Sequence, residues 1–416
     1  MEKAILVTVD LRIRDGWRAE DAARELRELA VSAGVHVHKE IICRRDKVSP
    51  AYFIGKGKAE ELALLARQEG IGVIVLNNDL SGSQQKNLEE IVGVKTVDRT
   101  QLILDIFARR ARSNEGKIQV ELAQLTYLLP RLIGKGIMLS RLGGGIGTRG
   151  PGEKKLEVDR RTIRDRIATL KGGLERLQAQ RRMRGKARAK IPVPSIAIIG
   201  YTNAGKSTLL NALTHANVIV QDKLFSTLDP TIRQFTLPTN QRVLFVDTVG
   251  FLHNLPHHLI ESFKATLEEV VDADILLHVL DITHPKVQQQ DRAVYEVLEE
   301  LGAVEKPIIS VLNKIDKADD AAVARFKRIF CDSIAISALH KINFEELIDR
   351  LVLQLSGLMD VVEFRMPQAR MDLLQMIYDH GRVLSKEYKG QDIVITAQVP
   401  IRIKELVKKI LLGGKG

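Results

Sequence analysis

The chain has 416 residues, 45% hydrophobic and 28% charged, a composition that supports several globular domains and excludes collagen-like or wholly disordered proteins. The chain has 63 Lys and Arg residues and 52 Asp and Glu residues. The resulting net charge of +11 is as consistent with binding to a polyanion as with a basic protein that has no such partner. Two cysteines, Cys43 and Cys331, cannot build a disulfide framework or a four-ligand zinc site, which indicates a reducing compartment. No run approaches the roughly 18 apolar residues of a spanning helix, and the N-terminus meets acid too early for a signal peptide. We therefore expect a cytoplasmic protein with no membrane span.

Residues 1–112 alternate β-rich runs with helical periodicity, which predicts a small α/β unit with a mostly parallel sheet. The expected strands are 4–11, 36–43 and 71–76, and the expected helices are 20–33, 58–68 and 83–91.

Residues 113–190 change character, because apolar residues recur there every three or four positions on otherwise polar helices. The two apolar seams are Ile118, Leu122, Leu125 and Leu129 in the first helix, and Ile163, Ile167, Leu170, Leu174 and Leu177 in the second. Each seam is too narrow for a helix that is buried on all sides. We therefore predict that the two helices pair as an antiparallel hairpin.

The connection between these helices, residues 134–152, contains eight glycines and is flanked by Lys and Arg. A basic loop with little side-chain bulk can approach a nucleic-acid backbone closely, and the alternative is a flexible tip without a partner. The candidate RNA contacts are Arg141, Gly143, Gly144, Gly145 and Arg149. A second basic run, 181–190, leads into a Pro-containing linker and indicates a domain boundary near residue 190.

The central domain begins with an apolar strand run at 195–199, followed directly by phosphate-loop spacing and a helical pattern. Main-chain N–H groups at the start of such a helix favour phosphate. Lys206 adds positive charge at the β and γ phosphates, and Ser207 offers a hydroxyl to Mg²⁺. The candidate phosphate-binding residues are Gly200, Tyr201, Thr202, Asn203, Ala204, Gly205, Lys206, Ser207 and Thr208.

A second motif predicts which base is bound. The carboxylate of Asp316, just after an expected strand at 308–312, can accept hydrogen bonds from N1–H and the 2-amine of guanine. Adenine has neither donor and would leave that carboxylate unpaired. Another expected strand, 333–336, precedes a backbone segment for the guanine oxygen. The base-binding candidates are Asn313, Lys314, Ile315, Asp316, Ser337, Ala338 and Leu339, and together they predict GTP as substrate and GDP as product.

Two further segments are candidate switches. Asp247, after a strand at 244–246, is expected to hold Mg²⁺ directly or through water, and the Gly250 amide is expected to meet the γ-phosphate. Thr227 is the preferred second hydroxyl for Mg²⁺, and Thr231 is the alternative. The switch candidates are Phe225, Ser226, Thr227, Leu228, Asp229, Asp247, Thr248, Val249 and Gly250. We expect Lys206, Thr227 and Gly250 to be catalytic, and Ser207, Thr227 and Asp247 to hold the metal.

Phe251 stands where many GTPases have a glutamine that orients the attacking water. A phenyl ring cannot make that hydrogen bond, so we predict slow hydrolysis without a partner. Asn203 stands where GTPases that use K⁺ have an asparagine, which makes K⁺ a candidate cofactor and a loop-stabilising hydrogen bond the alternative. His253 and His257 have a spacing that could share a metal, but Pro256 argues against one continuous helix, and a solvated switch segment is favoured.

Beyond residue 357 a strand (361–365), a helix (369–378), a strand (392–399) and a helix (401–411) predict a small domain. The predicted fold class is α/β throughout. Its parts are an N-terminal α/β unit (1–112), an antiparallel helical hairpin with the Gly-rich basic loop (113–190), a P-loop GTPase domain with a mostly parallel sheet (191–357) and a C-terminal α/β domain (358–416).

Together these motifs resemble the HflX family of GTPases. The resemblance lies in the phosphate loop at 200–208, the first switch at 225–231, the Asp-Thr-Val-Gly-Phe segment at 247–251 and, most specifically, the Gly-rich segment at 140–153. It covers essentially the whole chain and is least distinctive beyond about residue 360. It implies a factor that binds the large ribosomal subunit and its rRNA and splits or rescues stalled ribosomes. It also implies hydrolysis stimulated by the ribosome, with the Gly-rich loop directed towards the peptidyl-transferase region.

Other functions stay open at this point. The protein could be a nucleotide-gated module that binds ribosomes or RNA and splits nothing, since both functions need the same switch and basic loop. Some family members are credited with ATP use or RNA unwinding by their N-terminal part, but no second phosphate-loop pattern precedes residue 190. A membrane-linked signalling role is disfavoured by the missing span, and we expect a monomer.

Overall fold

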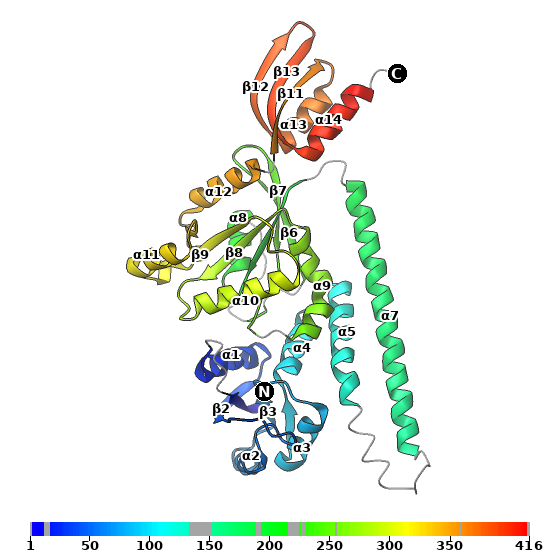
Figure 1. Ribbon diagram of the computed structural model, residues 1–416, viewed down its shortest axis with the longest axis vertical. Helices are drawn as coiled ribbons and strands as arrows, with labels where there is room; N and C mark the ends of the chain where they lie inside the picture. Colours follow the sequence, from blue (N-terminus) through cyan, green and yellow to red (C-terminus); the bar gives the residue numbers. More distant parts are fainter. Residues whose placement is uncertain are drawn as a thin grey trace. The chain divides into compact units, whose positions relative to one another are not determined.

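The computed structural model describes residues 2–11, 17–132, 151–188, 193–214, 224–225, 229–253, 256–357 and 359–413. The chain divides into two compact units (Figure 1). The first comprises residues 1–178 with 221–229 and 254–266, and the second comprises 179–220, 230–253 and 267–416. No helix among the described residues is both long and apolar enough to cross a membrane.

The N-terminal part of the first unit is a parallel four-stranded sheet in the order β2-β1-β3-β4. Its elements are β1 (Lys3–Asp10), α1 (Ala19–Ser32), β2 (His36–Arg44), α2 (Lys56–Glu69), β3 (Val73–Leu76), α3 (Gly82–Val92), β4 (Lys95–Val97) and α4 (Arg99–Arg110). The apolar run of β1 is buried because the strand lies inside the sheet, with Ile5 and Val7 fully enclosed. The predicted strands and helices are confirmed. Strand β4, which is only three residues long, and helix α4 after it were not predicted.

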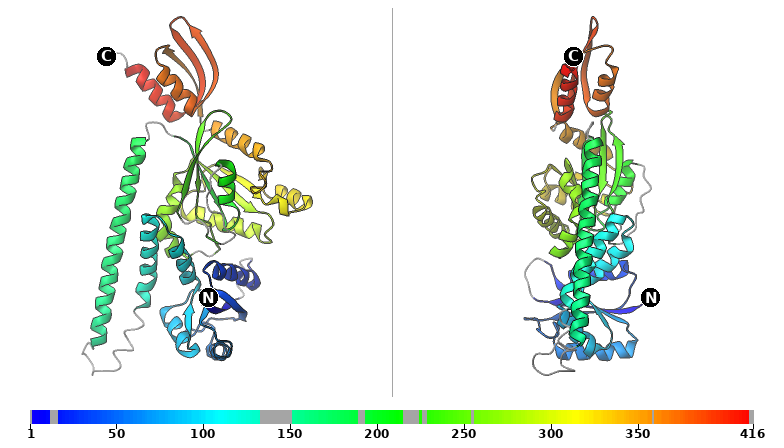
Figure 2. Two further views of the ribbon diagram at one scale, coloured as in Figure 1. Left: turned by 180° about the vertical axis from the view of Figure 1, so that it is seen from behind. Right: turned by 90° about the vertical axis from the view of Figure 1, so that its right-hand side faces the viewer.

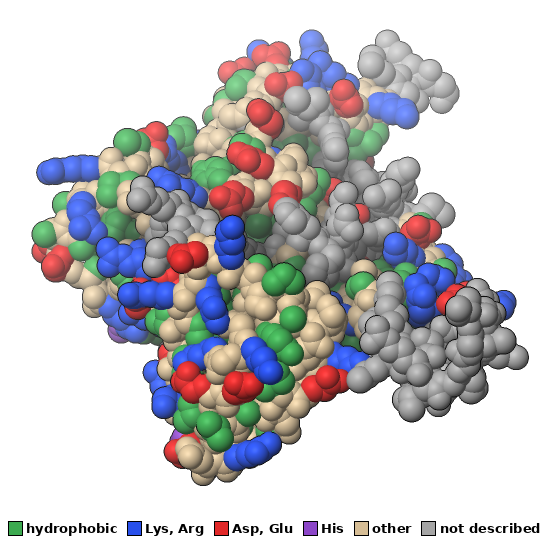
Figure 3. All heavy atoms as spheres, turned by 60° about the horizontal axis from the view of Figure 1, so that its bottom comes forward, with side chains coloured by type: hydrophobic (Ala, Val, Ile, Leu, Met, Phe, Trp, Pro, Cys, Tyr) green, Lys and Arg blue, Asp and Glu red, His purple; other side chains and the backbone are tan. Residues whose placement is uncertain are grey.

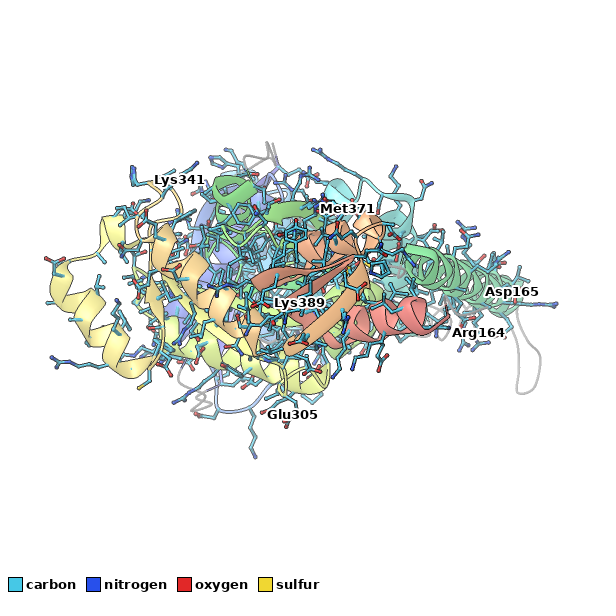
Figure 4. The ribbon with its side chains drawn as sticks, turned by 90° about the horizontal axis from the view of Figure 1, so that it is seen from above. Arg164, Asp165, Glu305, Lys341, Met371 and Lys389 are labelled. Atoms are coloured by element: carbon cyan, nitrogen blue, oxygen red, sulfur yellow. The ribbon has the colours of Figure 1, made fainter. Side chains whose placement is uncertain are left out.

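Helices α5 (Asn114–Arg131) and α7 (Pro151–Arg188) lie side by side (Figures 1 and 2). Leu122 of α5 is buried with Leu170 and Leu174 of α7, and Ile118, Leu125 and Ile167 pack around them. Arg166 donates two hydrogen bonds, of 2.7 and 2.9 Å, to the Glu121 carboxylate. The predicted pairing of the two apolar seams is thus confirmed. Arg164 and Asp165 point away from α7 on its exposed side (Figure 4).

The second unit contains a six-stranded sheet in the order β10-β9-β8-β5-β7-β6, parallel except for β6. Its strands are β5 (Ser195–Gly200), β6 (Thr231–Thr236), β7 (Arg242–Asp247), β8 (Ile275–Asp281), β9 (Ile308–Asn313) and β10 (Ile334–Ala335). Its helices are α8 (Lys206–Thr214), α10 (Val287–Glu300), the 3₁₀ turn η1 (Ile315–Lys317), α11 (Asp320–Ile329) and α12 (Phe344–Ser356). Helix α9 spans His257–Asp272. The segments that follow β5, β7 and β9 meet at the carboxyl edge of this sheet, where open parallel sheets bind ligands.

The C-terminal part is an antiparallel sheet in the order β11-β13-β12, with two helices on one face. Its elements are β11 (Met359–Pro367), α13 (Met371–His380), β12 (Arg382–Lys389), β13 (Asp392–Pro400) and α14 (Ile401–Gly413). Strand β13 alternates buried and half-buried residues, as a sheet with one covered face requires. The four predicted elements are confirmed, and β12 was missed because it is mostly polar and exposed. On the face shown in Figure 3, Lys and Arg are interspersed with Asp and Glu.

Candidate nucleotide-binding site

The loop between β5 and α8 contains two glycines at positions where the backbone leaves no room for a side chain. Gly200 has φ 146° and Gly205 has φ 99°, conformations that L side chains rarely adopt. A Cβ at Gly200 would lie within 3.0 Å of the Val279 carbonyl oxygen, and one at Gly205 would lie equally close to Asn313 Nδ2. The segment with phosphate-loop spacing therefore has a backbone that packs closely against Val279 and Asn313 before α8 begins.

Lys206 begins α8 and its side chain is buried beneath the loop. Its Nζ donates to the carbonyl oxygens of Gly200 at 3.2 Å and Tyr201 at 2.8 Å. Burial lowers the pKa of Lys206 to about 8, and the neighbouring Asp247 carboxylate opposes this shift. A Cβ at Gly250 would lie within 3.0 Å of Thr202 Cα and of Lys206 Nζ, so a side chain there would displace the phosphate-loop backbone as well as the ammonium.

Ser207 and Asp247 form the oxygen pair that the sequence assigned to Mg²⁺. The Ser207 hydroxyl donates to Asp247 Oδ2 at 2.6 Å, and both side chains are buried. A hydroxyl and a carboxylate are oxygen donors of the type that Mg²⁺ prefers, so the residues fit that ion. Thr248 is turned the other way, since its hydroxyl donates to the Ile198 carbonyl at 2.7 Å. Thr231, the alternative hydroxyl, opens β6 directly opposite Asp247.

Phe251 is fixed against the phosphate loop by its backbone. Its N–H donates to the Gly200 carbonyl at 3.1 Å, and its carbonyl accepts from the Thr202 N–H at 2.9 Å. The ring is only 2% exposed. The residue that replaces the common glutamine is therefore a packed core side chain in this structure.

Among the residues that the structure describes, no group of three or more His, Cys, Asp or Glu side chains is placed to hold a metal ion. The Tyr201 hydroxyl accepts a hydrogen bond from the His253 N–H at 2.8 Å. Helix α9 begins at His257, directly after Pro256, as the sequence analysis expected. The side chains of His257 and His258 lie outside the described residues.

The loop after β9 is joined to the phosphate loop by Asn313. Its side-chain Nδ2 donates to the Ala204 carbonyl at 2.8 Å, and its Oδ1 accepts from the Ala338 N–H at 2.9 Å. The Ser337 hydroxyl donates to Asp316 Oδ1 at 2.6 Å. One amide side chain thus ties the phosphate-binding and base-binding loops together, while a serine orients the carboxylate predicted to bind guanine. Leu339 is exposed and Ile315 is half-buried.

Asp281, at the end of β8, was not predicted from the sequence. Its Oδ2 lies 2.6 Å from Lys314 Nζ, and its Oδ1 accepts from the N–H and hydroxyl of Thr283. Lys314 has φ 66°, which an L residue adopts at some cost, and this ion pair contributes to holding it there. The only signal in the sequence was an acidic residue at a strand end, 33 positions before Lys314.

Several residues predicted to contact the nucleotide or RNA do not lie in the described part of this site. Phe225 and Asp229 belong to the first unit, where Phe225 packs on Phe107 and Asp229 accepts hydrogen bonds from Arg112 and Ser113. Outside the described residues lie Ser226, Thr227, Leu228, Arg141, Gly143, Gly144, Gly145 and Arg149.

A phosphate loop between a parallel strand and a helix, joined through Asn313 to a loop of guanine-binding type, defines the class of P-loop GTPases. Comparison with protein families agrees with that class. Residues 20–108 match the family described as GTP-binding GTPase N-terminal, residues 110–188 match GTP-binding GTPase Middle Region, and residues 195–314 match 50S ribosome-binding GTPase.

Relatives with curated names are similar along almost the full chain. The GTPase HflX of Caldanaerobacter subterraneus subsp. tengcongensis is 47% identical over 99% of this chain and 94% of its own length. The GTPase HflX of Escherichia coli K12 is 41% identical over 91% and 89%. A GTP-binding protein of Sulfolobus solfataricus, solved in complex with GDP, is 25% identical with a TM-score of 0.45 and covers 86% of this chain and 100% of its own. The chain belongs to the HflX family of GTPases, and it is a GTP-hydrolysing enzyme.

Proposed function

We propose that this GTPase binds the large ribosomal subunit and its rRNA and uses GTP to split or rescue stalled ribosomes. The observation that carries the proposal is the match of residues 195–314 to the family described as a 50S ribosome-binding GTPase. The formal net charge of +11 is consistent with an RNA partner. We expect the protein to work as a monomer in the cytoplasm.

The hairpin supports a specific mode of contact. Because α5 and α7 are paired through Leu122, Leu170 and Leu174, they form a stalk that is stiffer than a single helix. The sequence between them carries the glycines and cations proposed to contact RNA. These are Arg141, Gly143, Gly144, Gly145 and Arg149.

The geometry of the second unit supports the nucleotide roles that we propose. We assign the phosphates to the loop at 200–208 and to Lys206, and the guanine base to Asp316 as oriented by Ser337. Ser207 and Asp247 would hold Mg²⁺, with Thr227 as the preferred further ligand and Thr231 as the alternative. Such an ion neutralises charge on the β and γ phosphates. The Gly250 amide, close to Lys206, is assigned to the γ-phosphate.

Hydrolysis by the isolated protein should be slow. The Phe251 ring is buried and has no group that orients water, so the water must be positioned by another residue, an ion or the ribosome. Asn203, which has φ 62° in the phosphate loop, is the residue proposed to favour K⁺. Exchange of K⁺ for Na⁺ at constant ionic strength tests this, and equal turnover in both salts would contradict it.

The decisive experiment measures GTP turnover by the full-length protein with and without isolated large ribosomal subunits. We expect the subunits to stimulate turnover, and Gly144→Phe to weaken that stimulation because a bulky ring blocks close approach to RNA. Gly172→Ala in α7 is the matched control, since a Cβ there meets nothing within 4 Å. If the subunits do not stimulate turnover, or if Gly144→Phe leaves the stimulation unchanged, the proposal that the large ribosomal subunit is the partner is refuted.

A nucleotide-gated module that binds ribosomes without splitting them is the second candidate, because the same switch and hairpin serve it. Light scattering of intact ribosomes separates the two functions. Scattering that falls when the protein and GTP are added indicates splitting. Unchanged scattering, with protein still bound in the presence of a non-hydrolysable analogue, indicates the binding module.

A further inference from the structure

The phosphate loop contains a buried hydroxyl group that makes no hydrogen bond within the described part of the chain. Thr202 is only 6% exposed, and its Oγ1 has no hydrogen-bond partner among the residues that the structure describes. A buried hydroxyl without a partner costs free energy, and most such groups in folded proteins are paired. Valine has nearly the same shape and avoids this cost, so packing alone does not account for a threonine at this position.

The main-chain N–H of Thr202 is already used within the protein. It donates to the Phe251 carbonyl oxygen at 2.9 Å, while the Phe251 N–H donates to the Gly200 carbonyl oxygen at 3.1 Å. These two hydrogen bonds fix the phosphate loop against the segment that follows β7. The hydroxyl is therefore the donor of Thr202 that is left to bind a ligand.

Thr202 lies beside the two groups that we assign to the γ-phosphate. A Cβ at Gly250 would lie 2.8 Å from both Cα and Cγ2 of Thr202, and 2.9 Å from Lys206 Nζ. The Thr202 side chain and the Lys206 ammonium therefore meet at Gly250. The hydroxyl and Cγ2 are attached to the same Cβ, so rotation about χ1 from one staggered position to another brings the hydroxyl to the place of Cγ2.

The reaction of this enzyme gives a polar group at this position a role. The charge of the γ-phosphoryl group is spread over three oxygens, which GTPases stabilise with several positioned groups. Phe251 stands where many GTPases have a glutamine, and its buried ring offers no such group. A hydroxyl that donates to a charged phosphate oxygen forms a charge-assisted hydrogen bond, which is stronger than one between neutral groups.

We propose that the Thr202 hydroxyl donates a hydrogen bond to a γ-phosphate oxygen of bound GTP. This inference rests on the proposed assignment of the γ-phosphate to Lys206 and to the Gly250 amide. GDP has no γ-phosphate, so the hydroxyl stabilises the GTP complex and not the GDP complex. Thr202 therefore contributes to the difference in affinity between the two nucleotides, and such a difference is what allows a ligand to shift a protein between two states.

Thr202→Val in the full-length protein tests this, because valine keeps the shape and removes only the hydroxyl. Equilibrium titration should show that the affinity for a non-hydrolysable GTP analogue falls about tenfold, the loss of one hydrogen bond to a charged group, with GDP affinity changed less than about twofold. Thr202→Ser keeps the hydroxyl and should retain the affinity for the analogue. Thr236→Val is the matched control, since Thr236 is exposed and pairs with Arg242, at the opposite end of β7 from Asp247.

Three results would contradict the proposal. If Thr202→Val leaves both affinities unchanged, the hydroxyl does not contact the nucleotide. If both affinities fall equally, Thr202 acts only on the structure of the loop. If turnover at saturating GTP falls while the affinity for the analogue is retained, the hydroxyl acts on the attacking water and not on the γ-phosphate.

Lys206→Ala tests the underlying assignment separately. If this variant leaves the affinities for both nucleotides unchanged, the phosphate assignment is wrong, and the inference about Thr202 is wrong with it. If Lys206→Ala lowers these affinities and Thr202→Val does not lower the affinity for the analogue, only the hydroxyl contact is refuted.

Discussion

Two helix N-termini of this protein differ in the groups that they offer to an anion. Helix α5 presents two main-chain N–H groups and the Ser113 hydroxyl to one carboxylate, that of Asp229. Helix α8 follows a loop with left-handed glycine geometry and adds the buried ammonium of Lys206, close to Asp247. A single carboxylate is satisfied by amides and a hydroxyl, whereas a triphosphate with several negative charges also requires a cation.

The largest effect should come from removing that cation. Lys206→Ala is expected to lower GTP affinity on the order of 1,000-fold, about 4 kcal/mol, because truncating one member of a buried charge pair costs 2–5 kcal/mol. Equilibrium titration with a fluorescent GTP analogue measures it. Lys327→Ala, at an exposed position of α11, is the control. A loss of less than tenfold would mean that the amides of α8 suffice, as those of α5 do for Asp229.

The choice of base should be separable from the binding of phosphate. Asp316→Asn removes the carboxylate that Ser337 orients, so we expect the preference for GTP over xanthosine triphosphate to fall about 100-fold, the loss of two charge-assisted hydrogen bonds. Competition titrations with both nucleotides measure the ratio, and Asp320→Asn on α11 is the control. An unchanged ratio would show that other groups recognise guanine.

Titration of Lys206 should make nucleotide binding depend on pH. Burial places its pKa at about 8, so the free protein loses this positive charge as pH rises past that value. Bound phosphate favours the protonated form, and binding above pH 8 therefore takes up a proton and weakens by about tenfold per pH unit. Calorimetry in two buffers of different ionisation enthalpy detects the proton. Constant affinity between pH 7 and 9.5 would contradict the assignment.

The smallest effect concerns the α5 cap itself. Ser113→Ala removes the side-chain acceptor for the Gly116 N–H and one donor to Asp229, so we expect a loss of about 1 kcal/mol in unfolding free energy. Guanidinium unfolding measures this, and Ser385→Ala, at an exposed position of β12, is the control. An effect equal to that of the control would mean that the two N–H groups alone hold the carboxylate.

Much of the architecture was predictable because it depends on local pattern. The apolar run at 195–199, the glycine spacing after it and the seams of the hairpin are contiguous or periodic, and each matches an element that the structure contains. Elements without strong periodicity were missed. Strand β4 is too short to show a pattern, and β12 forms because it pairs with β13.

The sequence by itself determined the class of enzyme, since phosphate and guanine recognition need particular residues at fixed spacing within short segments. Only the tertiary structure decided which distant groups meet. Asp281 reaches Lys314 because β8 and β9 are adjacent, and Asp229 reaches Ser113 across 116 positions of sequence. A carboxylate in a loop accepts hydrogen bonds from any correctly placed donor. The residues next to it in the sequence therefore do not indicate which donor it binds. Chain packing alone brings that donor within reach.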